Sequence, residues 1–233
     1  MKRAYILVVL IIAVSSLSCE KDELKLPSEL NIEFDMNAFS LDEEASKGPQ
    51  LLIIDEGSLI INTMEFDGKR EQGDDYFFSS SFEIPVEAEM HTGKSNQNIS
   101  FDIPQGIYNS IEMNIKIGDK EKTALRLKGR LSKGPFEDIP VVFEYSFSEE
   151  IRVRAEDKQG NRQIILRKDR PSTARIIMDA PRLCRLLNMR MIMMANQAVV
   201  NGEQILLINN TQNTEIFNIM ATRLDQSLRV IFE

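Results

Sequence analysis

Alternation of apolar and polar side chains is the feature that most constrains how this chain can fold. In the clearest example apolar or small residues occupy every second position: Phe78, Ser80, Phe82, Ile84, Val86, Ala88 and Met90. Successive side chains of a strand point to opposite faces, so this period predicts a strand with one buried and one solvated face. Pro85 falls on the polar face. Because proline cannot donate to a sheet ladder, we expect this strand at a sheet edge or with a bulge.

Similar segments, separated by turn-rich stretches, recur between residues 30 and 179. They centre on 30–36, 57–66, 99–103, 111–117, 125–131, 139–147, 151–153, 164–166 and 174–178. A series of short strands with one wet and one apolar face each favours two packed antiparallel sheets. We therefore predict a mainly β fold, a two-sheet antiparallel β-sandwich of Ig-like or transthyretin-like type, over 30–179.

The period changes after Asp179. Apolar residues first fall at helical spacing: Leu183, Leu187, Met191, Met194 and Ala198. Asp179 and Pro181 suit the start of that helix, and the pair Asn201-Gly202 suits its end. A strand at 204–208, a second helix through Ile216 and Met220, and a last strand at 228–232 follow. We predict that 180–233 is a small α+β, helix-rich portion packed on the sandwich.

The N-terminus has the layout of a secretory signal. Lys2 and Arg3 precede the uncharged run Ala4 to Val14, which is followed by small residues. As a helix this run spans about 16 Å, against about 30 Å for the hydrocarbon core of a bilayer. Residues 1–18 are therefore predicted to be a leader that is removed.

The end of this leader, Ser16-Leu17-Ser18-Cys19, resembles the lipobox of bacterial lipoproteins. That resemblance implies that Cys19 receives a diacylglycerol and becomes the acylated first residue, with 19–29 as a tether. Two or three acyl chains make such anchoring stable. Lys21, Asp22 and Glu23 resemble the Lys-acid-acid export tag of Bacteroides-type lipoproteins, which implies an outer-membrane anchor facing the cell exterior. The alternatives are an ordinary signal with a chance cysteine, and an anchor that faces the periplasm.

A second resemblance covers about residues 51–179. It is carried by 57–61, 65–70, 73–78 and above all by Ile103-Pro104-Gln105-Gly106-Ile107-Tyr108, a P-x-G-x-Y turn before an alternating strand. These motifs resemble the uncharacterised β-sandwich surface lipoproteins of Bacteroides-type bacteria. The resemblance implies a fold and a location, and it assigns no activity.

Charge and residue types restrict the possible partners and chemistry. The net charge is −8, and loss of Lys2 and Arg3 with the leader makes it −10. Nucleic acid is not an expected partner, because its affinity comes mainly from Lys and Arg neutralising phosphates. Cys184, in an apolar stretch, is expected in the core, and His91, the only histidine, is expected to be exposed. We predict no catalytic residues and no metal or other cofactor, because one His and one free Cys cannot build the usual zinc ligand set.

Other candidate groups have structural interpretations that we favour. Asp67, Glu71, Asp74 and Asp75 share a turn but lack the order of a calcium loop, so we predict a solvated turn. The aromatic candidates for a carbohydrate platform are Tyr76, Phe77, Tyr108 and Tyr145. For Tyr76 and Phe77 we favour packing against the second sheet or the helices over an exposed surface. The methionines at 189, 191, 193 and 194 are expected in a helix core rather than on a binding surface.

These observations lead to three hypotheses of different classes. The first is a non-enzymatic, lipid-anchored cell-envelope protein that acts as an adhesion, envelope or ligand-binding module, with an unknown protein or glycan ligand. The second is a subunit of a fimbria-like surface polymer, in which an edge strand pairs with a neighbour. The third is a hydrolase of unrecognised type.

Overall fold

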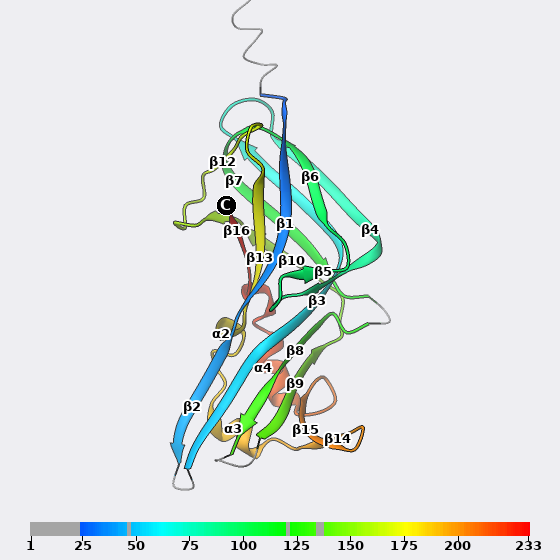
Figure 1. The fold of residues 1–233 in the computed structure, drawn as a ribbon, viewed down its shortest axis with the longest axis vertical. Coiled ribbons are helices and arrows are strands. Elements are labelled where there is room, and N and C mark those ends of the chain that lie inside the picture. The colour runs from blue at the N-terminus through cyan, green and yellow to red at the C-terminus, as the bar shows by residue number, and fades with distance from the viewer. Residues whose placement is uncertain (1–23, 46–47, 120–121, 134–137) are drawn as a thin grey trace, which may run out of the picture.

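The computed structural model describes residues 24–45, 48–119, 122–133 and 138–233, which form two β-sheets and a few short helices (Figure 1). The smaller sheet has the spatial order β11 (Glu156–Asp157), β16 (Leu228–Phe232), β13 (Ser172–Asp179), β1 (Pro27–Asn37) and β6 (Ile99–Pro104). Seven strands of the larger sheet follow one path: β10 (Glu149–Arg154), β7 (Gly106–Ile117), β3 (Gly48–Arg70), β8 (Leu125–Ser132), β9 (Asp138–Tyr145), β15 (Glu203–Ile208) and β14 (Ala198–Val200). Four more attach to its sides: β2 (Phe39–Ala45), β4 (Tyr76–Glu89), β5 (Lys94–Ser95) and β12 (Ile164–Leu166). The helices are α2 (Ala180–Leu183), α3 (Met189–Met194), α4 (Thr214–Ala221) and the 3-10 turn η1 (Leu224–Gln226).

The larger sheet is arranged around β3, which is 23 residues long. Along one edge β3 pairs first with β2 and then with β4, and along the other first with β8 and then with β7. Gly129 of β8 lies opposite Ile54, and a Cβ there would come within 1.8 Å of the Ile53 carbonyl oxygen. Only glycine permits this close approach of two backbones, so the position fixes how β8 docks on β3.

The alternating residues place the core between the sheets as predicted. Ile111, Met113, Ile115 and Ile117 of β7 are each at most 1% exposed, and Ile176 of β13 is fully buried. The mainly β, two-sheet architecture expected from the sequence is therefore confirmed. Both sheets are nevertheless mixed, because β1 with β13, β11 with β16 and β9 with β15 run parallel. Alternation reports which face of a strand is buried, and it carries no information on the direction of the neighbouring strand.

Strand β4 contains the predicted irregularity at Pro85. Ile61 pairs with Val86 and Thr63 with Ser81, so residues 82–85 oppose the single residue 62. Within this bulge the alternation is lost, and Ile84 is 71% exposed. The bulge is confirmed. The prediction that Ile84 faces the core is wrong, because the extra residues of a bulge interrupt the alternation and turn a side chain to the other face of the strand.

The C-terminal portion differs from its predicted secondary structure. The single helix expected through Leu183 and Ala198 is wrong: α2 and α3 are separated by a turn in which the Leu187 N–H donates to Cys184. Asn188 starts α3 anew, because its side chain accepts from the Met191 N–H at 3.0 Å.

Strands of this portion belong to both sheets. β16 lies between β11 and β13, and β15 pairs with β9. The division into domains at 179/180 stays a prediction. In the part of the chain described here, no helix has the length and apolar character needed to cross a membrane.

Candidate functional site

The residues predicted to carry the anchor lie outside the described part of the chain. These are Cys19 as the lipidation site and Lys21, Asp22 and Glu23 as the export tag. The lipid anchor and its orientation therefore stay predictions.

Cys184 and His91 occupy the environments that the sequence indicated. Cys184 is fully buried, and burial raises the pKa of its thiol to about 12. A thiol with such a pKa stays protonated near neutral pH and is a poor nucleophile. His91 is exposed, and its Nδ1 lies 3.5 Å from the Gly57 carbonyl oxygen.

The acidic segment that was expected to form one turn is divided in the structure, because Asp67 lies within β3 whereas Glu71, Asp74 and Asp75 follow it. The segment contains its own cation. The Lys69 ammonium lies 3.3 Å from a carboxylate oxygen of Asp67 and 3.3 Å from one of Asp75. The backbone N–H of Arg70 and the Lys69 side chain both hold the pKa of Asp75 below its ordinary value. Among the described residues no three His, Cys, Asp or Glu side chains are grouped closely enough to hold a metal ion.

The aromatic candidates do not form a platform. Tyr108 and Tyr145 are buried, and Tyr76 is half-buried with its ring centroid 6.3 Å from that of Phe66. Phe77 is 62% exposed, on the opposite face of its strand, so the expectation that it packs against the second sheet or the helices is wrong. The methionines at the helical segment are divided: Met189 is buried, Met191 and Met193 are partly buried, and Met194 is 73% exposed.

The P-x-G-x-Y turn has a structural role centred on Arg70. The Tyr108 hydroxyl donates to the Pro104 carbonyl at 2.7 Å. Nη2 of Arg70 donates to the carbonyls of Leu24 at 2.6 Å and Gln105 at 2.7 Å, and its guanidinium carbon lies 5.8 Å from the centre of the Tyr108 ring. We call these five residues the Arg70 cluster. Gly106 adopts φ +148° beside the guanidinium, where a side chain would be crowded. The cluster ties the start of the described chain to the larger sheet.

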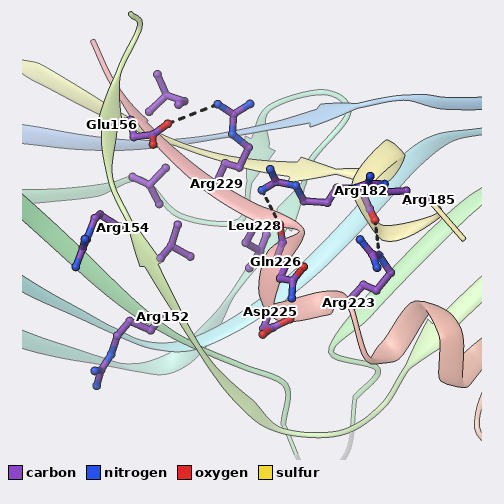
Figure 2. Close-up of a pocket in the computed structure, with 13 residues that line it drawn as sticks. Arg152, Arg154, Glu156, Arg182, Arg185, Arg223, Asp225, Gln226, Leu228 and Arg229 are labelled. Carbon is purple, nitrogen blue, oxygen red and sulfur yellow. Dashed lines mark hydrogen bonds and ion pairs between the residues drawn. The ribbon is translucent and has the colours of Figure 1, made fainter. Parts of the chain in front are cut away.

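A different group of arginines lines a pocket of about 470 Å³, which we call the arginine pocket (Figure 2). Six of the 15 arginines of the chain contribute: Arg152, Arg154, Arg182, Arg185, Arg223 and Arg229. The first two come from β10, the next two from α2 and the residues after it, and the last two from the segment around η1 and β16. Of the described residues that line the pocket, none is a lysine.

The arginine pocket lies between β10, at the edge of the larger sheet, and a part of β16 in the smaller sheet that has no described strand partner on one side. β10 ends the larger sheet, and the chain then passes through Ala155 to β11 of the smaller sheet. β11 pairs with β16 only at Ile231 and Phe232. In the described structure the adjoining stretch of β16, from Leu228, therefore has no strand partner on the side that faces β10.

Backbone contacts fix two of the pocket arginines. Nη1 of Arg182 donates to the Gln226 carbonyl at 3.1 Å, and Nε of Arg223 donates to the Arg182 carbonyl at 3.0 Å. The two bonds join α2 to the η1 segment, and beside them the Asp179 N–H at the end of β13 donates to the carbonyl of Ser227, the residue after η1, at 2.8 Å. Figure 2 shows Arg182, Arg223 and Arg229 grouped around Gln226, with β10 across the pocket.

The electrostatics of the arginine pocket oppose those of the whole chain. Among the described residues that line the pocket, six arginines outnumber two carboxylates, those of Glu156 and Asp225, which is a formal excess of four positive charges. The side chains of Arg152 and Arg154 extend away from the group around Gln226, so Arg182, Arg223 and Arg229 are the cations that Figure 2 shows together. Glu156 lies 3.9 Å from Arg229, which is a loose pair. Arg154 has a closer partner outside the pocket lining, Glu112 at 2.7 Å. Such a concentration of positive charge in a chain of net charge −8 attracts small anions.

The arginine pocket was not predicted from the sequence. Arg152 and Arg154 have the spacing of one strand face, and Arg182 and Arg185 that of one helix face, but nothing in the sequence places these pairs near Arg223. Comparisons with protein-family models, curated proteins and solved structures find no match to the chain. The resemblance to surface lipoproteins stays a prediction.

Proposed function

We propose that this protein is a non-enzymatic, lipid-anchored protein of the cell envelope whose folded part is a ligand-binding module. Cys19 holds it at the outer membrane, and Lys21, Asp22 and Glu23 direct it to the cell exterior. The observation that carries the ligand-binding role is the arginine pocket: six arginines from three separate segments line it, and three of them, Arg182, Arg223 and Arg229, lie together around Gln226, in a chain that is acidic overall. A folded protein gathers like charges at a cost in repulsion, and a bound anion removes that cost.

The proposal that the protein is not an enzyme is supported by the state of Cys184, the candidate nucleophile, and of His91, the candidate base. Cys184 is buried and protonated, and the exposed His91 has the Gly57 carbonyl as its neighbour. Nucleophilic catalysis requires a base within hydrogen-bond reach of the nucleophile. Binding of an anion by the arginine pocket requires no nucleophile and no base.

The anchor is tested on material purified from native membranes. Intact-mass analysis should find Cys19 as the first residue with the mass of its acyl chains added. Labelling of intact cells with a membrane-impermeant amine reagent should reach the protein before the outer membrane is broken. An unmodified thiol, or a chain that starts elsewhere, would refute the anchor. If the protein in intact cells is not labelled until the outer membrane is broken, the outward orientation alone is refuted.

A second candidate function, a subunit of a surface polymer, is favoured by one observation. β14 ends the path of the larger sheet, and Val199 on it is 69% exposed. An apolar end strand of this kind can pair with a strand of another subunit. Unboiled surface extracts would then show ladders of high mass, whereas a monomer that persists at high concentration would exclude this function.

A further inference from the structure

We propose that the arginine pocket binds a small organic phosphate or sulfate ester. This inference rests on the ligand-binding role proposed above and names the chemical class of the ligand. The volume of about 470 Å³ lies within the range of roughly 300–1,000 Å³ that is usual for small-molecule sites. A tetrahedral oxyanion occupies only part of that space, so the remainder suits the organic group that carries it.

The choice of arginine points to an oxyanion. Each guanidinium presents a planar fork of N–H groups that matches two oxygens of one phosphate or sulfate group, whereas an ammonium acts as a point charge. Arg182 and Arg223 each use a single side-chain nitrogen in the cross-link between α2 and η1. In the described structure the other side-chain N–H groups of Arg182 and Arg223 make no hydrogen bond, and Arg185 makes no side-chain hydrogen bond or ion pair. Donors for an anion are thus present, and the cross-link holds two of them in place.

An acidic peptide in strand conformation is a poorer fit. Its insertion between the edges of β10 and β16 would separate those strands by about 9.5 Å, twice the usual spacing. Cα atoms of β10 and β16 approach within 8 Å of each other. The pocket is therefore closed to a full added strand and open to a compact ligand.

The test measures binding to the full mature chain, purified in a nonionic detergent, by titration calorimetry. Three matched probes are glucose 6-phosphate, glucose 6-sulfate and glucose. We expect both esters, or one of them, to bind and glucose not to bind, with affinity that falls as salt is raised. A preference between the two esters identifies phosphate or sulfate as the natural group.

Variants then assign the binding to the pocket. Arg229→Gln and Arg185→Gln should each weaken ester binding roughly tenfold, which is the usual value of a charge-assisted hydrogen bond. Asp225→Asn removes a lining carboxylate and should tighten binding several-fold. Arg162→Gln is the matched control, because Arg162 is exposed and lies outside the pocket lining.

Three outcomes would overturn the proposal. They are a lack of binding of either ester, binding of a polyglutamate peptide in preference to both esters, and an equal loss of affinity in Arg162→Gln and the pocket variants. These results leave the mass and labelling tests of the anchor unaffected. Failure of the oxyanion assignment is therefore distinguishable from failure of the envelope location.

Discussion

The Arg70 cluster and the arginine pocket use the same side chain in opposite ways. Arg70 is partly buried, and its two terminal nitrogens donate to three backbone carbonyls, those of Leu24, Gln105 and Asp74, while its Nε has no partner in the described structure. Arg185 in the pocket is exposed and has no such acceptors in the described structure. An arginine whose donors are used within the fold stabilises it, whereas one whose donors remain open is available to a ligand.

The same comparison applies to the backbone around each region. In the Arg70 cluster β6, the turn and β7 are joined through the Tyr108 hydroxyl, and the Gln105 N–H donates to Leu26. Around the arginine pocket two sheet edges separate, and part of β16 is left without a strand partner on one side. The first region is closed by its own hydrogen bonds, and the second leaves an opening lined by cations.

The largest expected effect is the loss of stability in Arg70→Met. This change removes a charged donor from the carbonyls of Leu24 and Gln105 and should lower the free energy of unfolding by about 2–4 kcal/mol. Urea denaturation of the mature chain measures it. Arg70→Lys keeps the charge without the fork and should fall between wild type and Arg70→Met. Equal stability of all three proteins would show that the cluster is not a structural centre.

A smaller effect is expected from Tyr108→Phe. The ring stays in the core, and only the hydroxyl that donates to Pro104 is removed, so unfolding should become easier by about 1 kcal/mol. The same urea experiment measures this change. Tyr76→Phe is a suitable control, because the Tyr76 hydroxyl lies 3.4 Å from the Asp102 carbonyl in an exposed position. A similar loss in both variants would argue against a special role for the Tyr108 bond.

The same tyrosine predicts how stability depends on alkaline pH. Burial raises the pKa of Tyr108 from about 10 to about 12, although the nearby Arg70 cation acts in the other direction. Between these values the unfolded chain has lost the proton that the folded chain keeps, so stability is full below about pH 10 and falls as the pH rises to about 12. Tyr108→Phe lacks this group and should lose less stability over the same interval. Parallel pH profiles of the two proteins would contradict the assignment.

How far the sequence could predict this molecule depends on the kind of information each feature needs. Burial of the alternating residues in β7 and the bulge at Pro85 follow from local rules, and both are confirmed. The parallel pairing of β1 with β13 joins segments some 140 residues apart, and strand pattern alone does not specify such partners.

The arginine pocket was unpredictable for the same reason. The arginines that line it come from distant segments: the chain leaves β10 of the larger sheet for β11 of the smaller one, and two arginine side chains join α2 to the η1 segment by donating to backbone carbonyls. The P-x-G-x-Y turn, by contrast, is continuous in sequence, so it could be recognised as a turn. The turn motif does not predict the part played by Arg70. This residue lies 34 residues before Pro104, and its side chain donates to the Gln105 carbonyl in the turn.

The smallest expected effect is on the stability of Arg185→Gln. This variant distinguishes arginines that bond within the fold, such as Arg70, from the pocket arginines, whose donors are open to a ligand. Arg185 is exposed, makes no side-chain hydrogen bond or ion pair in the described structure, and has five like charges around the same pocket. Its removal should change the free energy of unfolding by less than about 0.5 kcal/mol, and any change should favour the folded state through reduced repulsion. Arg126→Gln is the matched comparison, because Arg126 is also exposed but donates to the Glu144 carboxylate at 2.8 and 3.0 Å. If Arg185→Gln destabilised the protein as much as Arg70→Met does, the pocket arginines would have to be regarded as part of the fold, and the distinction between a structural and a binding region would fail.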